Sequence, residues 1–108
     1  MIIQKNSENK DLLHSKQRAT LRGLANAIEP VTQVGKAGVT EIFLKELDKA
    51  IEKRELIKVT VLENSGEEVK KVGEEIAEKL NAEFVCATGK KLVFYRRSKS
   101  EKAVHIEF

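Results

Sequence analysis

The sequence predicts an α/β fold: a single compact domain with the order α-β-α-β-α-β-β, in which a four-stranded mixed sheet is packed by three helices. Apolar residues recur at helical spacing in three segments, and four shorter runs are rich in the β-branched and aromatic residues typical of strands. A chain of 108 residues is long enough to bury one hydrophobic core without disulfides or metal ions. These observations indicate one domain.

We expect the first helix to begin near Ser15, whose hydroxyl can cap its amino terminus. Its buried side is predicted to hold residues at helical spacing, namely Gln17, Leu21, Leu24, Ala25 and Ile28. Arg18 and Arg22 lie four residues apart on a neighbouring stripe, so this helix is basic as well as amphipathic. Pro30 prevents the helix from continuing, and residues 31–34 then form a short strand.

The second helix is predicted to begin after Thr40, which can cap it. Its buried stripe consists of Phe43, Leu47, Ala50 and Ile51. Residues 56–62 alternate apolar and polar side chains, which indicates a strand. A helix between two strands favours a parallel pair, so residues 35–38 should lie at the carboxyl end of the first strand, where open α/β sheets bind ligands.

A third helix is predicted after a turn at residues 64–66, with a mostly acidic outer face. Its buried positions are Val69, Val72, Gly73, Ile76, Ala77 and Leu80. Residues 84–88 and 91–96 flank Gly89-Lys90, a connection typical of a tight hairpin. Beyond it, the alternation of Val104, Ile106 and Phe108 fits either an edge strand or a partner-binding tail.

The charged residues are distributed unevenly along the chain. Residues 1–38 hold six basic against three acidic side chains, and residues 86–108 hold six against two. Residues 39–85 run the other way, with eight basic against twelve acidic side chains. If the two ends meet in space, one face of the domain is positive, as in nucleic-acid-binding proteins, although an acidic protein partner would be attracted as well.

The residue types that support catalysis are scarce. The single cysteine, Cys86, permits no internal disulfide and no metal cluster, and its apolar neighbours favour a buried thiol in a reducing compartment. His14 and His105 lie in the terminal segments, and no Ser/His/Asp or Cys/His spacing indicates a catalytic site. No signal peptide or membrane span is evident. We therefore expect a cytoplasmic protein that is not an enzyme and needs no cofactor.

The loop Gly35-Lys36-Ala37-Gly38 is the strongest candidate for a binding site. Its two glycines allow backbone N–H groups and the first turn of the next helix to approach an anion, and Lys36 adds a positive charge. A GxxG loop clamps backbone nucleotides in the KH class of RNA-binding domains. The motif by itself more often marks an ordinary turn, so the rest of the chain must support this interpretation.

Several segments together resemble a stand-alone bacterial YhbY-type CRM domain (chloroplast RNA splicing and ribosome maturation domain). They are Ser15-Lys16-Gln17-Arg18, Leu21 to Ala25, Pro30-Val31, Gly35 to Gly38, Glu55 to Val59 and Gly89 to Arg96. The resemblance covers roughly residues 12–97, and it implies a fold similar to the C-terminal domain of translation initiation factor 3. It also implies RNA binding through the GxxG loop and association with precursors of the large ribosomal subunit.

On this reading, residues 1–13 form a flexible leader, residues 14–97 the RNA-binding domain, and residues 98–108 a charged tail. The predicted RNA-binding residues are Lys16, Arg18, Arg22, Gly35, Lys36, Ala37, Gly38, Lys90, Lys91, Tyr95 and Arg96. Tyr95 is the candidate ring for stacking on a base, and the others would contact phosphate.

Each of these assignments has a structural alternative. Arginines on an amphipathic helix are commonly solvated, and lysines at a hairpin can block aggregation through strand edges. For the whole protein, the leading hypothesis is a monomer that binds ribosomal RNA by shape and backbone. The alternatives are a basic protein-interaction module and a duplex DNA binder.

Overall fold

The computed structural model describes residues 15–35, 37–62, 66–100 and 105–106. The predicted order of helices and strands is confirmed. The elements are α1 (Ser15–Ala25), β1 (Thr32–Val34), α2 (Glu41–Arg54), β2 (Leu56–Val61), α3 (Gly66–Leu80), β3 (Glu83–Thr88) and β4 (Lys91–Tyr95).

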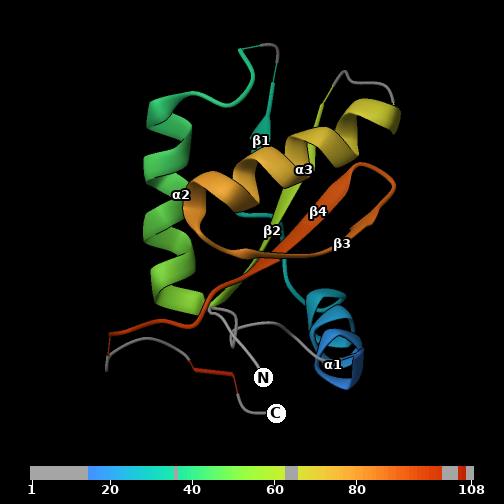
Figure 1. Ribbon diagram of the computed structural model, residues 1–108, viewed down its shortest axis with the longest axis vertical. Coiled ribbons are helices and arrows are strands. Elements are labelled where there is room, and N and C mark those ends of the chain that lie inside the picture. Colours follow the sequence, from blue (N-terminus) through green and yellow to red (C-terminus); the bar gives the residue numbers. More distant parts are fainter. Residues whose placement is uncertain (1–14, 36, 63–65, 101–104, 107–108) are drawn as a thin grey trace, which may run out of the picture.

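The four strands form one mixed sheet in the order β1-β2-β4-β3. β1 and β2 are parallel, as predicted from the helix that joins them, whereas β4 is antiparallel to both β2 and β3. The last strand therefore lies inside the sheet and β3 forms one edge. Helices α2 and α3 pack on one face of this sheet, and α1 packs on the other (Figure 1).

The main hydrophobic core lies between the sheet and helices α2 and α3. Its largest fully buried side chains are Leu47, Ile51, Ile57, Ile76, Leu92 and Phe94. A smaller core lies on the opposite face, where Leu21 and Ala25 of α1 pack against Leu56, Val85, Val93 and Tyr95. Strand β4 contributes apolar side chains to both cores, because successive side chains of a strand point to opposite faces.

Helix α1 is shorter than the sequence predicted. It ends at Ala25, and the N–H groups of Asn26, Ala27 and Ile28 donate to carbonyls three residues earlier, as in a tight turn. Leu24, which was expected on the buried side, is 43% exposed. Since only Leu21 and Ala25 of this helix are buried, its contact with the sheet is one turn long.

Helix α2 begins as predicted, because the Thr40 hydroxyl accepts a hydrogen bond from the N–H of Phe43 at 3.1 Å. The helix ends at Glu55, whose φ of 66° turns the chain directly into β2. A non-glycine residue in this left-handed region carries a cost of about 1 kcal/mol. Glu55 offsets that cost through the contacts of its buried carboxylate.

The Glu55 carboxylate holds the C-terminal segment against the domain. It accepts hydrogen bonds from the N–H groups of Ser98 at 2.7 Å and Ile106 at 2.8 Å, and from Nδ1 of His105 at 2.7 Å. Ile106 packs against the smaller core and lies outside any strand, while Val104 and Phe108 are not among the described residues. At Ile106, therefore, the tail contacts its own domain.

His105 bonds two acceptors, because its Nε2 also lies 2.9 Å from the Ser100 carbonyl oxygen. A neutral imidazole carries one N–H, so only the protonated ring satisfies both. The hydrogen bond to Glu55 raises the pKa of His105. Burial raises the pKa of Glu55, but hydrogen bonds from Ile106, Ser98 and His105 outweigh it and leave that pKa lowered.

These shifts predict a pH window for docking of the tail. Protonated His105 stabilises the docked tail below the ordinary histidine pKa of about 6.5, and this stabilisation is lost as the pH rises through the raised pKa of His105. Ionised Glu55 stabilises the docked tail above about pH 4.3, and this stabilisation is lost as the pH falls through the lowered pKa of Glu55. Docking should therefore be strongest near pH 5 to 6.5. An NMR titration should show the His105 pKa above 6.5, and Glu55→Gln should bring it down; a value at or below 6.5 in the wild type would contradict the prediction.

Candidate nucleic-acid interface

The register of the sheet brings the GxxG loop and the β3–β4 hairpin to the same end. Val34 lies opposite Val61, and Thr60 lies opposite Lys91. The N–H of Leu62 donates to the Val34 carbonyl at 2.8 Å, and that of Val61 donates to the Lys90 carbonyl at 2.7 Å. The loop after β1 and the hairpin tip are thus two strand spacings apart, or about 10 Å.

The loop itself is a closed turn at the start of α2. The N–H of Gly38 donates to the Gly35 carbonyl at 3.0 Å, and Gly38 has a φ of 74°. Ala37 is exposed, and Lys36 lies outside the described residues. The amino terminus of α2 follows directly, so its partial positive charge faces this end of the sheet. Exposed Glu41 in the first turn offsets part of that charge.

The hairpin tip supplies positive side chains. Gly89 has a φ of 60°, which gives the chain its tight reversal, and Lys90 and Lys91 are both exposed. The structure therefore places two of the predicted hairpin residues beside the predicted loop. The end of β1 and the hairpin tip, which are far apart in the sequence, thus lie at one end of the sheet, and the exposed positive side chains described there are Lys90 and Lys91.

Two other predicted residues, Tyr95 and Arg96, lie elsewhere, because β4 runs away from the hairpin tip. Tyr95 is 7% exposed and packs in the smaller core beneath α1, so the prediction of a stacking ring was wrong. The guanidinium of Arg96 donates to Asp48 at 2.8 Å, to Glu52 at 3.1 Å and to the Leu80 carbonyl at 2.7 Å. These contacts join α2 and α3 to the end of β4, which is a structural role.

The basic residues of α1 are also separate from the loop. Arg18 donates to the Phe84 and Val85 carbonyls at 3.1 and 3.2 Å and to Glu83 at 3.1 Å, at the irregularity between Phe84 and Cys86 in β3. Lys16 and Arg22 are exposed. In Figure 1, α1 lies at the lower right and the loop between β1 and α2 at the top. The structure thus separates α1 from the loop and the hairpin tip.

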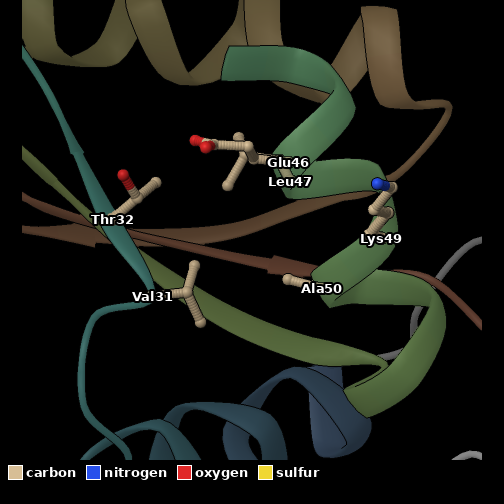
Figure 2. Close-up of a pocket in the computed structure, with 6 residues that line it drawn as sticks. All are labelled: Val31, Thr32, Glu46, Leu47, Lys49 and Ala50. Atoms are coloured by element: carbon tan, nitrogen blue, oxygen red, sulfur yellow. The ribbon is translucent and has the colours of Figure 1, made fainter. Parts of the chain in front are cut away.

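A groove of about 360 Å³ lies between β1 and α2 (Figure 2). Its lining consists of Val31, Thr32, Glu46, Leu47, Lys49 and Ala50. Its two charged lining residues, Glu46 and Lys49, have opposite signs, so the groove has no excess of positive charge to attract a polyanion. The basic sheet end is therefore the better candidate for an anionic ligand.

The described part of the chain also bears on metal binding and on membrane crossing. Within it, no group of His, Cys, Asp and Glu side chains is arranged to hold a metal ion. Nor does any described helix have the length and apolar character that crossing a bilayer requires.

Sequence reasoning did not select four polar residues as candidate binding residues, although they share one face of the sheet. They are Lys58, Thr60, Gln33 and Thr88. The alternation along residues 56–62 does show that Lys58 and Thr60 point away from the main core. Their alignment with Lys91 depends on which strands pair, and the sequence carries no signal for that pairing.

The fold defines a small single-domain α/β protein, in which three helices pack on a four-stranded mixed sheet. Residues 13–96 match the model of the CRS1 / YhbY (CRM) domain. The chain belongs to the CRS1 / YhbY (CRM) domain family.

Similar proteins come from several bacteria. The "Probable RNA-binding protein YqeI" of Bacillus subtilis is 37% identical over 95 residues, which cover 88% of this chain and 99% of that protein. An "RNA-binding protein" of Haemophilus influenzae is 37% identical over 90 residues, or 83% of this chain and 91% of that one. The solution structure of hypothetical protein SAV1595 from Staphylococcus aureus is 42% identical, with a TM-score of 0.75, and covers 84% of this chain and 95% of that one.

The two loop glycines should respond differently to alanine. A Cβ at either position would meet no heavy atom within 4 Å, but only Gly38 has a positive φ. Gly38→Ala should therefore lower the free energy of unfolding by about 1 kcal/mol, whereas Gly35→Ala should leave it unchanged or raise it slightly. Urea denaturation of both variants measures this difference. Equal stabilities would show that the turn at Gly38 relaxes without cost.

Proposed function

We propose that this protein binds RNA, and that it contacts the phosphate backbone of ribosomal RNA through the GxxG loop and the neighbouring hairpin lysines. The observation that carries the proposal is the sheet register, which brings the loop and Lys90-Lys91 to one end of the domain. Relatives from Bacillus subtilis, Methanocaldococcus jannaschii and Haemophilus influenzae carry names that describe RNA binding, which supports the same ligand class.

The proposed recognition is electrostatic and geometric. Backbone N–H groups of residues 35–38 and the first turn of α2 would bond phosphate oxygens, and Lys36, Lys90 and Lys91 would add charge-assisted contacts. Among the described residues, every Phe and Tyr ring is buried or partly buried. Scarcity of exposed rings favours recognition of backbone and shape over stacking on unpaired bases. In this proposal the protein acts without catalysis or a cofactor, as a cytoplasmic monomer.

We further propose that the RNA lies in precursors of the large ribosomal subunit. Support for this step comes from the resemblance to YhbY-type domains, which spans the same part of the chain as the family match.

Binding should depend steeply on salt. Each phosphate contact contributes about 0.7 to 0.9 to the slope of log affinity against log salt concentration. The triple variant Lys36→Gln, Lys90→Gln and Lys91→Gln should therefore bind large-subunit RNA fragments more weakly, with a slope that is lower by about two to three. Fluorescence anisotropy across a salt series measures both quantities.

Lys70→Gln with Lys71→Gln is the matched control, because both lysines are exposed on α3. The control should retain the wild-type slope. Equal losses in the two variants would contradict an interface at the loop, and tighter binding to duplex DNA than to RNA at equal salt would favour the DNA-binding alternative.

The assembly role predicts where the protein sediments. In sucrose gradients of lysate at low salt, wild-type protein should migrate with large-subunit precursors, and the triple lysine variant should remain at the top. Immunoblots of the fractions measure this distribution. Wild-type protein that stays free of every ribosomal particle, while still binding RNA in vitro, would overturn the assembly role.

A further inference from the structure

One polar side chain from each of the four strands lies in a single row across the sheet. Gln33 of β1 is opposite Thr60 of β2, Thr60 is opposite Lys91 of β4, and Lys91 is opposite Thr88 of β3. Directly paired residues point to the same face. These four residues are called the polar row below.

The polar row points away from α2 and α3. Its neighbours along the strands, Val34, Val59, Val61 and Leu92, belong to the main core beneath those two helices. Because alternate residues of a strand face opposite sides, the row lies on the face that carries α1.

Helix α1 covers only the far end of that face. Its buried residues pack against Leu56, Val85, Val93 and Tyr95, which lie further from the loop than the polar row. Gln33, Thr88 and Lys91 are exposed, and Thr60 is half-buried. No described helix or strand therefore covers the part of the sheet next to the GxxG loop on this side.

The electrostatics of this open surface favour an anion. Lys58 lies two pairs along the strand toward α1, opposite Val93, on the same face as Lys91. The four strands contain a single acidic residue, Glu83, which lies at the far end and pairs with Arg18. Thus Lys58 and Lys91 are accompanied by hydroxyl and amide groups, with no carboxylate from any strand beside them.

We propose that the polar row binds the ribose-phosphate backbone of an RNA strand that continues from the GxxG loop, and that it distinguishes RNA from DNA. This inference rests on the proposed function and specifies which groups of the RNA the polar row recognises. Lys91 of the row and the adjacent Lys58 contact phosphates, while Thr60, Thr88 and Gln33 bond 2′-hydroxyl groups. A 2′-hydroxyl both donates and accepts, and hydroxyl and amide side chains offer both capacities.

The dimensions and position of the row suit this ligand. Four strands span about 14 Å between the first and last, which accommodates several nucleotides at a rise of about 3.4 Å each. Gln33 is separated from Gly35 only by Val34, so the row begins where the loop begins. A strand held at the loop can therefore pass directly onto the open face.

The test compares RNA with DNA of the same sequence in a salt series. Thr60→Val combined with Thr88→Val removes two hydroxyls while keeping the β-branched shape that strands favour. This variant should lose about tenfold in RNA affinity, as expected for two hydrogen bonds, with an unchanged salt slope and unchanged DNA affinity. Lys58→Gln with Lys91→Gln should instead weaken RNA and DNA alike and lower the slope by about one to two.

Thr32→Val is the matched control, because Thr32 is a strand threonine that lines the groove on the α2 side. It should leave RNA affinity unchanged. As a measurement that needs no variant, NMR titration of the wild type should shift the amides of Gln33, Thr60 and Thr88 with RNA more than with DNA.

The outcomes separate this inference from the proposed function. If the loop and hairpin variant loses RNA affinity while the double threonine variant does not, the polar row is overturned and the proposed function stands. Equal losses toward RNA and DNA in the threonine variant would overturn the recognition of 2′-hydroxyls. Wild-type protein that binds no RNA would overturn both.

Discussion

The position of β4 between β2 and β3 is the constraint on which the rest of the structure depends. Leu92 and Phe94 fill the main core, and Val93 and Tyr95 fill the smaller one, so both layers of helices pack on this strand. The same position brings the turn at Gly89-Lys90 beside the carboxyl ends of β1 and β2. A strand near the end of the chain thereby completes both the core and the basic end of the sheet.

A second set of contacts holds the opposite end of the sheet. Arg96, which follows β4, bonds Asp48, Glu52 and the Leu80 carbonyl, and Glu55 holds the backbone of Ser98 and Ile106. Charged side chains here are used within the domain, whereas those at the hairpin tip are exposed. The two ends of β4 therefore differ in role, although both are rich in basic residues.

The elements could be predicted because their signals are local. Thr40 caps α2, Gly89-Lys90 closes the hairpin, and the alternation along β2 separates Ile57, Val59 and Val61 from Lys58 and Thr60. The extent of α1 was less predictable, since Leu24 fits the apolar stripe but has no surface of the sheet to cover. Tyr95 was misassigned as a stacking ring, and Arg96 lies away from the hairpin tip, because charge nearby in sequence does not show which end of a strand a residue occupies.

The amino-acid sequence by itself determined the α/β class, the order of elements and the position of the GxxG loop, since propensity, caps and turns act over a few residues. The parallel β1–β2 pair followed from the helix that joins the two strands. Only the tertiary structure decided which charges meet. Strand order and register are set by long-range pairing. They brought the end of β1 and Lys90-Lys91 to one end of the sheet, aligned Gln33 with Thr60 and Thr88, and placed Tyr95 beneath α1. The proposed interface depends on that pairing because its residues come from segments far apart in the chain.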